Sequence, residues 1–173
     1  MNEADIPEPN YDDPNELYTF FGFTFYYAQV IEQSVVNLAV ALQAKGVGGL
    51  TASDVMDQYK RLEGRTFGNV LNAARKLTSI PASMDADLEQ ALKYRNQLAH
   101  SFFVERSDNL LTSAGRKVMI DELRSMLGFL TRVDEEFQTI WLAAWKKIGV
   151  SQAWFEHQFE IIRQKSLADQ GDA

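Results

Sequence analysis

The sequence predicts an all-α protein, a single helical bundle of four main helices with shorter helices between them. Apolar residues recur at intervals of three and four over most of the chain, which is the spacing of one helical face. No segment alternates apolar and polar residues as a half-buried strand does. A chain of 173 residues is long enough for one domain with one core. We expect the bundle over residues 14–166, an acidic flexible arm at 1–13 and a polar tail at 167–173.

The first predicted helix covers residues 14–45, with Asp13 as its N-terminal cap and Gly46 at its end. Apolar side chains surround almost the whole first half of this segment, and Glu32 is the only charge between residues 17 and 44. The segment is long enough to cross a membrane, but several polar side chains near its middle argue against that. We expect a central bundle helix that also forms a subunit interface.

Three shorter helices are predicted next, each with helical spacing of its apolar residues. Capping residues or helix breakers bound each of them, and the third is separated from the second by the proline turn at residues 80–82. The expected spans are Thr51 or Ser53 to Leu62, Phe67 to Leu77 after a Thr66 cap, and Ser83 or Asp85 to about Arg106.

A long helix is predicted from about Arg116 to Lys147, with Gly149 at its end. A last amphipathic helix is expected after a Ser151 cap. The tryptophans of both helices are expected to pack in the core, although indole rings can also stack on nucleic-acid bases. The apolar side of the last helix would consist of Trp154, Phe155, Phe159 and Ile162.

The formal net charge of −7 is mildly unfavourable to nucleic-acid binding, but the acidic residues are unevenly distributed. Six of them and no base precede residue 17, whereas residues 17–106 carry a net charge of +1. The acidity therefore belongs largely to the N-terminal arm, and the rest of the chain is compatible with a local basic site. Five basic residues form either a phosphate-binding edge or an ordinary solvated face: Lys60, Arg61, Arg65, Arg75 and Lys76.

The chain has no cysteine, which excludes disulfides, thiol nucleophiles and cysteine-ligated metals and is consistent with a cytoplasmic location. Its acidic, proline-containing N-terminus does not have the composition of a targeting signal. The carboxylates at 121–122 and 134–136 lack the Glu-x-x-His spacing of di-metal bundle sites, and no glycine-rich phosphate loop is present. We expect no metal and no cofactor.

The chemically most informative segment is Arg95-Asn96-Gln97-Leu98-Ala99-His100, in the third of the shorter helices. An imidazole titrates near neutral pH and can move a proton, while a guanidinium binds phosphate oxygens. Asn96 and His100, four residues apart, share one helical face. Residues five apart differ by about 140° around the axis, so Arg95 would reach the same cleft from the flank. Arg95, Asn96 and His100 together suit metal-independent RNA cleavage, in which a 2′-hydroxyl attacks the adjacent phosphorus.

The segment 94–103 resembles the motif of the HEPN superfamily, in which four to six residues separate an Arg, often followed by a polar residue, from a later His; four separate Arg95 from His100. The expected order of long, short and long helices is similar to that family as well. The resemblance implies a homodimer whose paired motifs form a metal-independent endoribonuclease site, as in toxin–antitoxin, antiphage and RNA-processing proteins. Arg95 and His100 would then be catalytic and Asn96 supportive. Phe102 stands where some HEPN toxins have a tyrosine that a partner nucleotidyltransferase modifies.

Each of these residues also has a purely structural alternative. His100 can be a core histidine that joins two helices, and Arg95 can form a salt bridge with Glu32 or with Asp87. Glu32 can orient His100, pair with Arg95 or point to solvent. Two hypotheses follow, with RNA or a regulatory protein as the respective partner. The first is an HEPN-like ribonuclease that uses Arg95 and His100 with support from Asn96 and Glu32. The second is a non-catalytic helical dimer acting as an interaction or antitoxin-like module.

Overall fold

The computed structural model describes residues 6–44, 52–62 and 64–151 and, further on, residues 153–154, 156–157, 160–161 and 163–164. Over these residues the chain is all-α and contains no strand, which confirms the all-α part of the predicted fold. No helix in this part of the chain has both the length and the apolar character needed to cross a membrane. The helices are, in order, α1 (Glu16–Gln43), α2 (Ala52–Leu62), α3 (Phe67–Leu77), α4 (Ala82–His100), α5 (Phe102–Glu105), α6 (Ser107–Leu110) and α7 (Ser113–Lys147).

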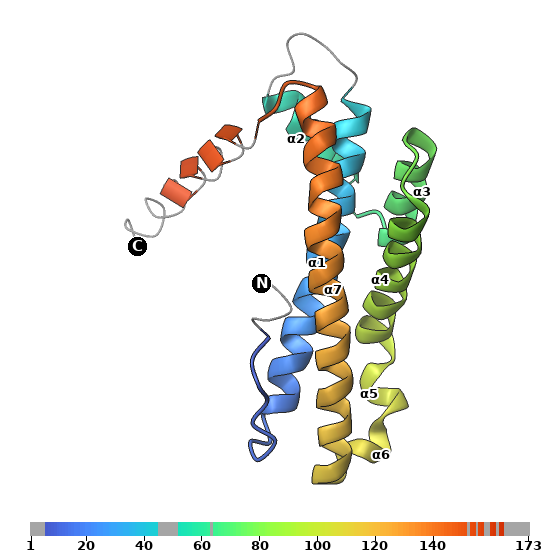
Figure 1. Cartoon of the computed structure of the whole chain (residues 1–173), viewed down its shortest axis with the longest axis vertical. Helices are drawn as coiled ribbons and strands as arrows, with labels where there is room; N and C mark the ends of the chain where they lie inside the picture. Colours follow the sequence, from blue (N-terminus) through green and yellow to red (C-terminus); the bar gives the residue numbers. More distant parts are fainter. Residues whose placement is uncertain are drawn as a thin grey trace.

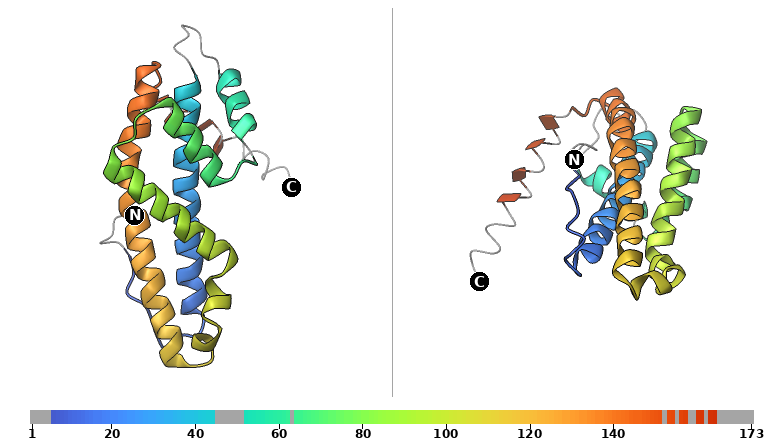
Figure 2. Two further views of the ribbon diagram at one scale, coloured as in Figure 1. Left: turned by 90° about the vertical axis from the view of Figure 1, so that its right-hand side faces the viewer. Right: turned by 60° about the horizontal axis from the view of Figure 1, so that its bottom comes forward.

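The two longest helices, α1 and α7, lie side by side and run in the same direction (Figure 1). They share the most extensive contact between any two helices, and α4 packs against both of them in the opposite direction (Figure 2). Helix α3 packs on α1, and α2 packs on the C-terminal half of α1. The short helices α5 and α6 connect α4 to α7. The helix that carries the sequence motif therefore lies against the central pair.

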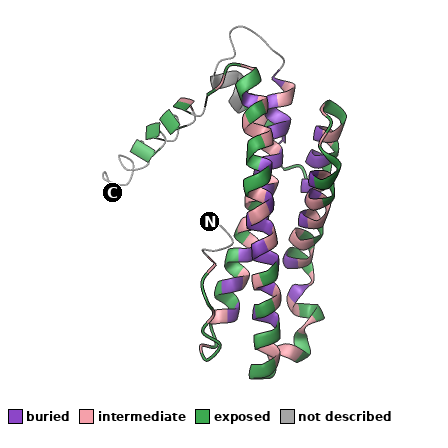
Figure 3. Ribbon diagram, in the orientation of Figure 1, coloured by how far each residue is buried: buried purple, intermediate pink, exposed green. Residues whose placement is uncertain are grey.

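The hydrophobic core lies between these helices, and buried residues recur along each of the long ones (Figure 3). Large side chains fill it, among them Phe20 of α1, Phe67 of α3 and Trp145 of α7, each at most 1% exposed. Thr24 is a polar residue in this core. Its hydroxyl donates to the carbonyl of Phe20 at 2.7 Å and lies 3.2 Å from the carbonyl of Leu123 on α7. Burial therefore leaves this group paired, at the point where α1 and α7 meet.

Two threonine caps set the starts of α3 and α7. The hydroxyl of Thr66 accepts a hydrogen bond from the Asn69 amide at 3.4 Å, which confirms the predicted cap of α3. The hydroxyl of Thr112 accepts from the Gly115 amide at 3.0 Å. This cap, which the sequence analysis missed, starts α7 before the expected position at Arg116.

The starts of α1 and α4 differ from the predicted ones. Helix α1 begins at Glu16, and the carboxylate of Asp13 accepts from the Asn15 amide at 2.8 Å, so Asp13 caps the turn that leads into the helix. Helix α4 begins directly after Pro81, whose fixed φ suits a helix start, and no side chain caps it. The predicted stop of the first helix at Gly46 and the Thr51 start of the next lie outside the described residues.

The prediction that the motif helix continues to about Arg106 is wrong. Helix α4 ends at His100, and Ser101 leaves helical geometry with φ −136° and ψ −12°. The break lets Phe102 enter the core, where it is 1% exposed. It also turns Arg106 over the Phe102 ring and into an ion pair with Glu122 of α7, at 2.6 Å from Nε to Oε2. The burial of Phe102 and the ion pair of Arg106 therefore stabilise the chain more than an unbroken helix through Ser101 would.

The described part of the N-terminal arm contacts α7. The carboxylate of Glu8 lies 2.5 Å from the Arg124 guanidinium. The hydroxyl of Tyr11 donates to Asp121, and the ammonium of Lys117 lies 4.5 Å from the Tyr11 ring. These contacts place acidic and aromatic side chains of the arm beside basic residues of α7.

At the other end of the chain, Ser151 is the predicted cap of the last helix. Its hydroxyl accepts from the Trp154 amide at 3.2 Å, as expected for such a cap. Phe155, Phe159, Ile162 and the predicted tail at 167–173 lie outside the described residues.

Candidate functional site

Arg95 and Glu32 meet between α4 and α1. The Nε of Arg95 lies 3.1 Å from Oε2 of Glu32, and the two side chains are 27% and 20% exposed. Of the alternatives that the sequence left open, the structure therefore selects pairing with Glu32, because Asp87 pairs instead with Arg132 of α7. The only charge in the middle of α1 is thus neutralised by the arginine of the motif.

The geometry of this ion pair leaves most of the arginine's donors unused. Glu32 accepts from Nε alone, and no other described residue forms a hydrogen bond or ion pair with the Arg95 guanidinium. A guanidinium has five N–H donors in a planar fork, so four remain at Nη1 and Nη2. A phosphate matches this fork with two parallel hydrogen bonds. Glu32 therefore holds Arg95 in place while the end of its side chain can bind an anion.

Asn96 and His100 lie on a different side of α4. Both are exposed, and the four-residue spacing places them on one helical face. His100 is the last residue of α4, and neither side chain has a hydrogen bond or ion pair with another described residue. The alternative of a core histidine is therefore wrong. The imidazole is accessible to a ligand, whereas Arg95 lies at the edge of the contact with α1.

An aromatic cluster follows the motif. The Phe103 ring lies 4.7 Å from that of Phe21 and 6.0 Å from that of Tyr18, and the Phe102 ring lies 5.7 Å from Phe21. Such ring pairs add to the stabilisation from burial alone. The cluster ties the chain just after His100 to the first half of α1 and so fixes where α4 ends.

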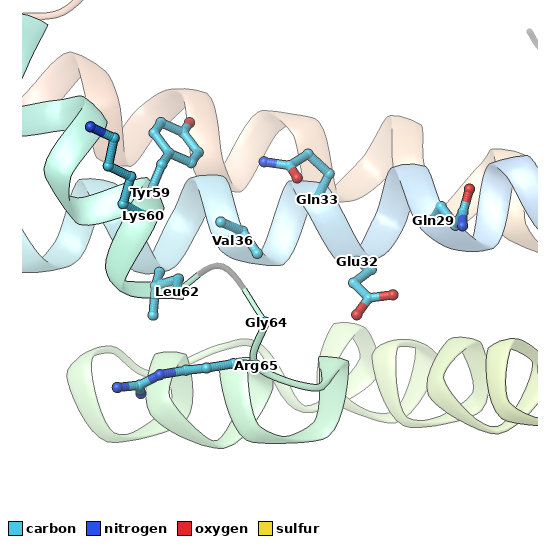
Figure 4. A pocket seen from close by; sticks show the side chains of 9 residues that line it. All are labelled: Gln29, Glu32, Gln33, Val36, Tyr59, Lys60, Leu62, Gly64 and Arg65. Atoms are coloured by element: carbon cyan, nitrogen blue, oxygen red, sulfur yellow. The ribbon is translucent and has the colours of Figure 1, made fainter.

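A pocket of about 480 Å³ lies beside Glu32, between α1, the C-terminal end of α2 and the connection to α3 (Figure 4). It combines two cations, two amides and one carboxylate with apolar side chains, and the glutamine and tyrosine members were not predicted. They could not have been found from spacing, because α1 and α2 approach each other only in the folded chain. The lining residues are Gln29, Glu32, Gln33, Val36, Tyr59, Lys60, Leu62, Gly64 and Arg65.

Tyr59 is a fixed wall of this pocket. Its hydroxyl donates to Oδ1 of Asn37 at 2.7 Å, and the same oxygen accepts from the Gln33 amide at 3.3 Å. Burial raises the pKa of Tyr59 to about 12. The phenol therefore stays protonated at neutral pH and ties α2 to α1, with no role as a base.

The predicted basic edge is divided between two surroundings. Arg75 forms ion pairs of 2.7 Å with Asp85 and with Glu89 of α4, which raise its pKa and use its charge within the fold. Lys60 and Arg65 instead line the pocket. Arg61 and Lys76 are exposed as well but do not line the pocket, so Lys60 and Arg65 are the cations of the edge that a ligand in the pocket can contact.

No group of three or more His, Asp or Glu side chains suited to a metal ion occurs in the described part of the chain. Comparison of the chain with protein-family models, with curated proteins and with solved structures gave no match.

Proposed function

We propose that this protein is an HEPN-like, metal-independent endoribonuclease that works as a homodimer. The observation that carries the proposal is the state of the two motif side chains. Arg95 is held by Glu32 through Nε alone, at 3.1 Å, and His100 is exposed at the end of the same helix. A positioned cation and an accessible imidazole are the two groups that phosphodiester cleavage without metal requires.

The reaction follows from these groups. The 2′-hydroxyl of the RNA attacks the adjacent phosphorus and gives its proton to a His100 imidazole, while the bond from phosphorus to the 5′-oxygen breaks. A second imidazole, protonated, donates a proton to the leaving 5′-oxygen. The products are a 2′,3′-cyclic phosphate and a 5′-hydroxyl. The Nη groups of Arg95 bind the nonbridging oxygens, where negative charge grows in the transition state.

We infer that the second imidazole is the His100 of a second copy of the chain, and the exposed surface of α1 supports such a dimer. Phe23 and Tyr26, with the half-buried Val30, are spaced three and four apart and form a stripe on α1, which we call the aromatic stripe after its two exposed rings. Phe23 is 42% and Tyr26 59% exposed. Interface cores are enriched in aromatic residues and depleted of charge. In a two-fold dimer, both copies would contribute a His100 to one composite site.

The proposal is tested by RNA cleavage in EDTA with mixed single-stranded and hairpin substrates. We expect wild type to cleave and His100→Ala to lose activity by about 10²-fold or more, the usual contribution of a general acid or base. The matched control is His157→Ala, which removes the chain's other histidine, also exposed, and should cleave like wild type. The proposal fails if His100→Ala cleaves as fast as wild type, or if wild type cleaves none of the substrates.

A second candidate, a non-catalytic interaction module, is favoured by one observation. Arg95 and Glu32 form a half-buried ion pair, which on its own is a structural contact between α4 and α1. Arg95→Lys separates the two functions because it keeps the charge but loses the planar fork. A ribonuclease loses activity with little change in stability. In an interaction module, the same variant alters only folding stability or partner affinity.

A further inference from the structure

The pocket beside Glu32 has the composition of an anion site. Lys60 and Arg65 stand at its rim, and Arg65 has no side-chain hydrogen bond or ion pair with any other described residue. The Lys60 ammonium lies 3.9 Å from Asp57, but both side chains are more than half exposed, so water screens this contact. Both cations are therefore available to a ligand.

The one described carboxylate in the pocket does not cancel these charges. Glu32 is already neutralised by Arg95, at 3.1 Å, and its carboxylate is directed toward α4 (Figure 4). The described residues of the lining thus have an excess of positive charge although the whole chain has a net charge of −7. Glu63, between Leu62 and Gly64, lies outside the described residues. A local excess of this kind attracts anions in spite of the net charge.

The remaining lining groups suit a nucleotide rather than a bare ion. Gln29 and Gln33 are exposed on neighbouring turns of α1, and their amides can donate to phosphate or sugar oxygens. Val36 and Leu62 add an apolar floor, and the volume of about 480 Å³ is in the usual range of ligand pockets. The pocket thus combines cations for a phosphate, amides for a sugar and apolar side chains for a base, which are the three parts of a nucleotide.

The position of the pocket connects it to the proposed reaction. Glu32 is shared: it lines the pocket on one side and holds Arg95 on the other. A strand with one phosphate between Lys60 and Arg65 would therefore continue toward the Nη groups of Arg95. Glu32 therefore links the pocket to Arg95 of the motif.

We propose that the pocket between α1, α2 and the connection to α3 binds the phosphodiester backbone of a single-stranded RNA and so delivers the strand to Arg95. This inference rests on the ribonuclease proposal for the identity of its ligand. Lys60 and Arg65 neutralise a phosphate, and Gln29 and Gln33 hold the adjoining sugar and phosphate oxygens.

The test measures binding without cleavage, on the full chain carrying His100→Ala in EDTA. A fluorescent single-stranded RNA of about 12 nucleotides is titrated by anisotropy at several salt concentrations. Replacing Lys60 and Arg65 by Ala is expected to weaken binding about tenfold or more. The slope of log K against log salt should fall by about 1.4, as for two lost phosphate contacts on a single strand.

Two further variants control this result. Lys76→Ala with Lys146→Ala removes two exposed cations outside the pocket and should leave the affinity within about twofold of the parent. Gln29→Glu with Gln33→Glu keeps both cations but adds two negative charges to the lining, and should weaken binding as much as the loss of the cations. Both glutamines are exposed, and the one hydrogen bond that these substitutions remove among the described residues is that from Gln33 to Asn37, at 3.3 Å.

Three results would overturn the inference: an unchanged affinity after loss of Lys60 and Arg65, displacement of the RNA by polyglutamate of equal charge, or binding of free AMP without binding of RNA. Kinetics separate this failure from that of the ribonuclease proposal. If wild type cleaves RNA and the pocket variants keep its KM, the pocket has no role and the nuclease stands. If the pocket variants lose RNA binding but wild type cleaves nothing, the binding site stands and the nuclease is rejected.

Discussion

Helices α1 and α7 are the two longest in the molecule and pack on each other, yet their outer faces differ in kind. The exposed residues of α1, which is described in full, include Tyr18, Phe23 and Tyr26 and no charged side chain. The exposed positions of α7 include a series of charged side chains: Lys117, Asp121, Glu135, Glu136, Lys146 and Lys147.

The difference predicts that the two outer faces have different surroundings, water for α7 and a partner for α1. The arginines of α7 already have partners within the chain, as Arg124 has Glu8 and Arg132 has Asp87 and Glu136. A face whose charges are solvated or paired is stable in water. The aromatic stripe of α1 instead leaves apolar surface exposed, which is characteristic of a site that binds another molecule.

The largest change in folding stability is expected from a substitution on the inner side of α1. Phe20 is fully buried, whereas Phe23, three residues later on the same helix, is 42% exposed. Phe20→Ala should lower the free energy of unfolding by about 3–5 kcal/mol because it leaves a cavity. Phe23→Ala should cost less than about 1 kcal/mol in the monomer. Urea unfolding at low protein concentration measures both, and equal losses would show that the stripe belongs to the core.

The next effect concerns association through the stripe. Tyr26→Glu places a charge in the centre of the proposed interface, and we expect the dimer to dissociate about 100-fold more readily, or about 2.7 kcal/mol. Val118→Glu on α7 is a matched control, because Val118 and Tyr26 are both 59% exposed. Sedimentation equilibrium gives both dissociation constants. A monomeric wild type, or equal weakening by both substitutions, would remove the contrast between the two faces.

Sequence reasoning found the helices because each one buries a face with regular spacing. Phe67 and Leu71, for example, mark the inner side of α3 at a spacing of four, and Thr66 marks its start. It missed the end of α4 because the break at Ser101 depends on partners distant in sequence. The turn is stabilised because Phe102 contacts the Phe21 ring and Arg106 pairs with the Glu122 carboxylate, and both partners are remote in sequence.

The candidate site, like the helices, was predictable from the sequence only in part. The motif residues Arg95 and His100 stand out by type and spacing, but the sequence could not say which acid would pair with Arg95. Two candidates, Glu32 and Asp87, lie on different helices, and only packing decides between them. The pocket beside Glu32 was beyond prediction for the same reason, since α1, α2 and a connecting segment form it together.

A smaller loss of folding stability is expected when a paired charge on α7 is removed. Arg132 contacts Asp87 at 3.1 Å and Glu136 at 3.0 Å and remains 40% exposed. Arg132→Gln should therefore cost only about 0.5–1 kcal/mol, because exposed ion pairs contribute little. Thermal melts in low salt and in about 1 M salt should show the loss only at low salt, where charges are not screened. A loss that persists in high salt would mean that the arginine acts by packing, over the Phe129 ring at 5.2 Å.

The smallest expected effect is the pH dependence of stability that arises from Asp134, a carboxylate of α7 that contacts α1. The Ser34 hydroxyl donates to Oδ1 of Asp134 at 3.2 Å, where the two helices meet. Burial raises the pKa of Asp134, and the bond from Ser34 opposes this only in part. The folded state therefore binds the Asp134 proton more tightly than the unfolded state does. This contribution to stability is complete below the ordinary carboxyl pKa and is lost as pH rises through the raised value.

Asp134→Asn removes this titration while keeping an oxygen that can accept from Ser34. The variant should gain stability relative to wild type as pH rises from about 4 to 7, by less than about 1 kcal/mol because the site is part-exposed. Urea unfolding across this range measures the difference, with Asp108→Asn as the control, because Asp108 is an exposed carboxylate on α6 away from Asp134. A difference that falls as pH rises would mean that the carboxylate is favourable where it lies, and a difference that does not change with pH would mean that folding leaves its pKa unshifted. The contact between α1 and α7 would then tolerate charge, and the lack of charge on the outer face of α1 would be the more specific feature.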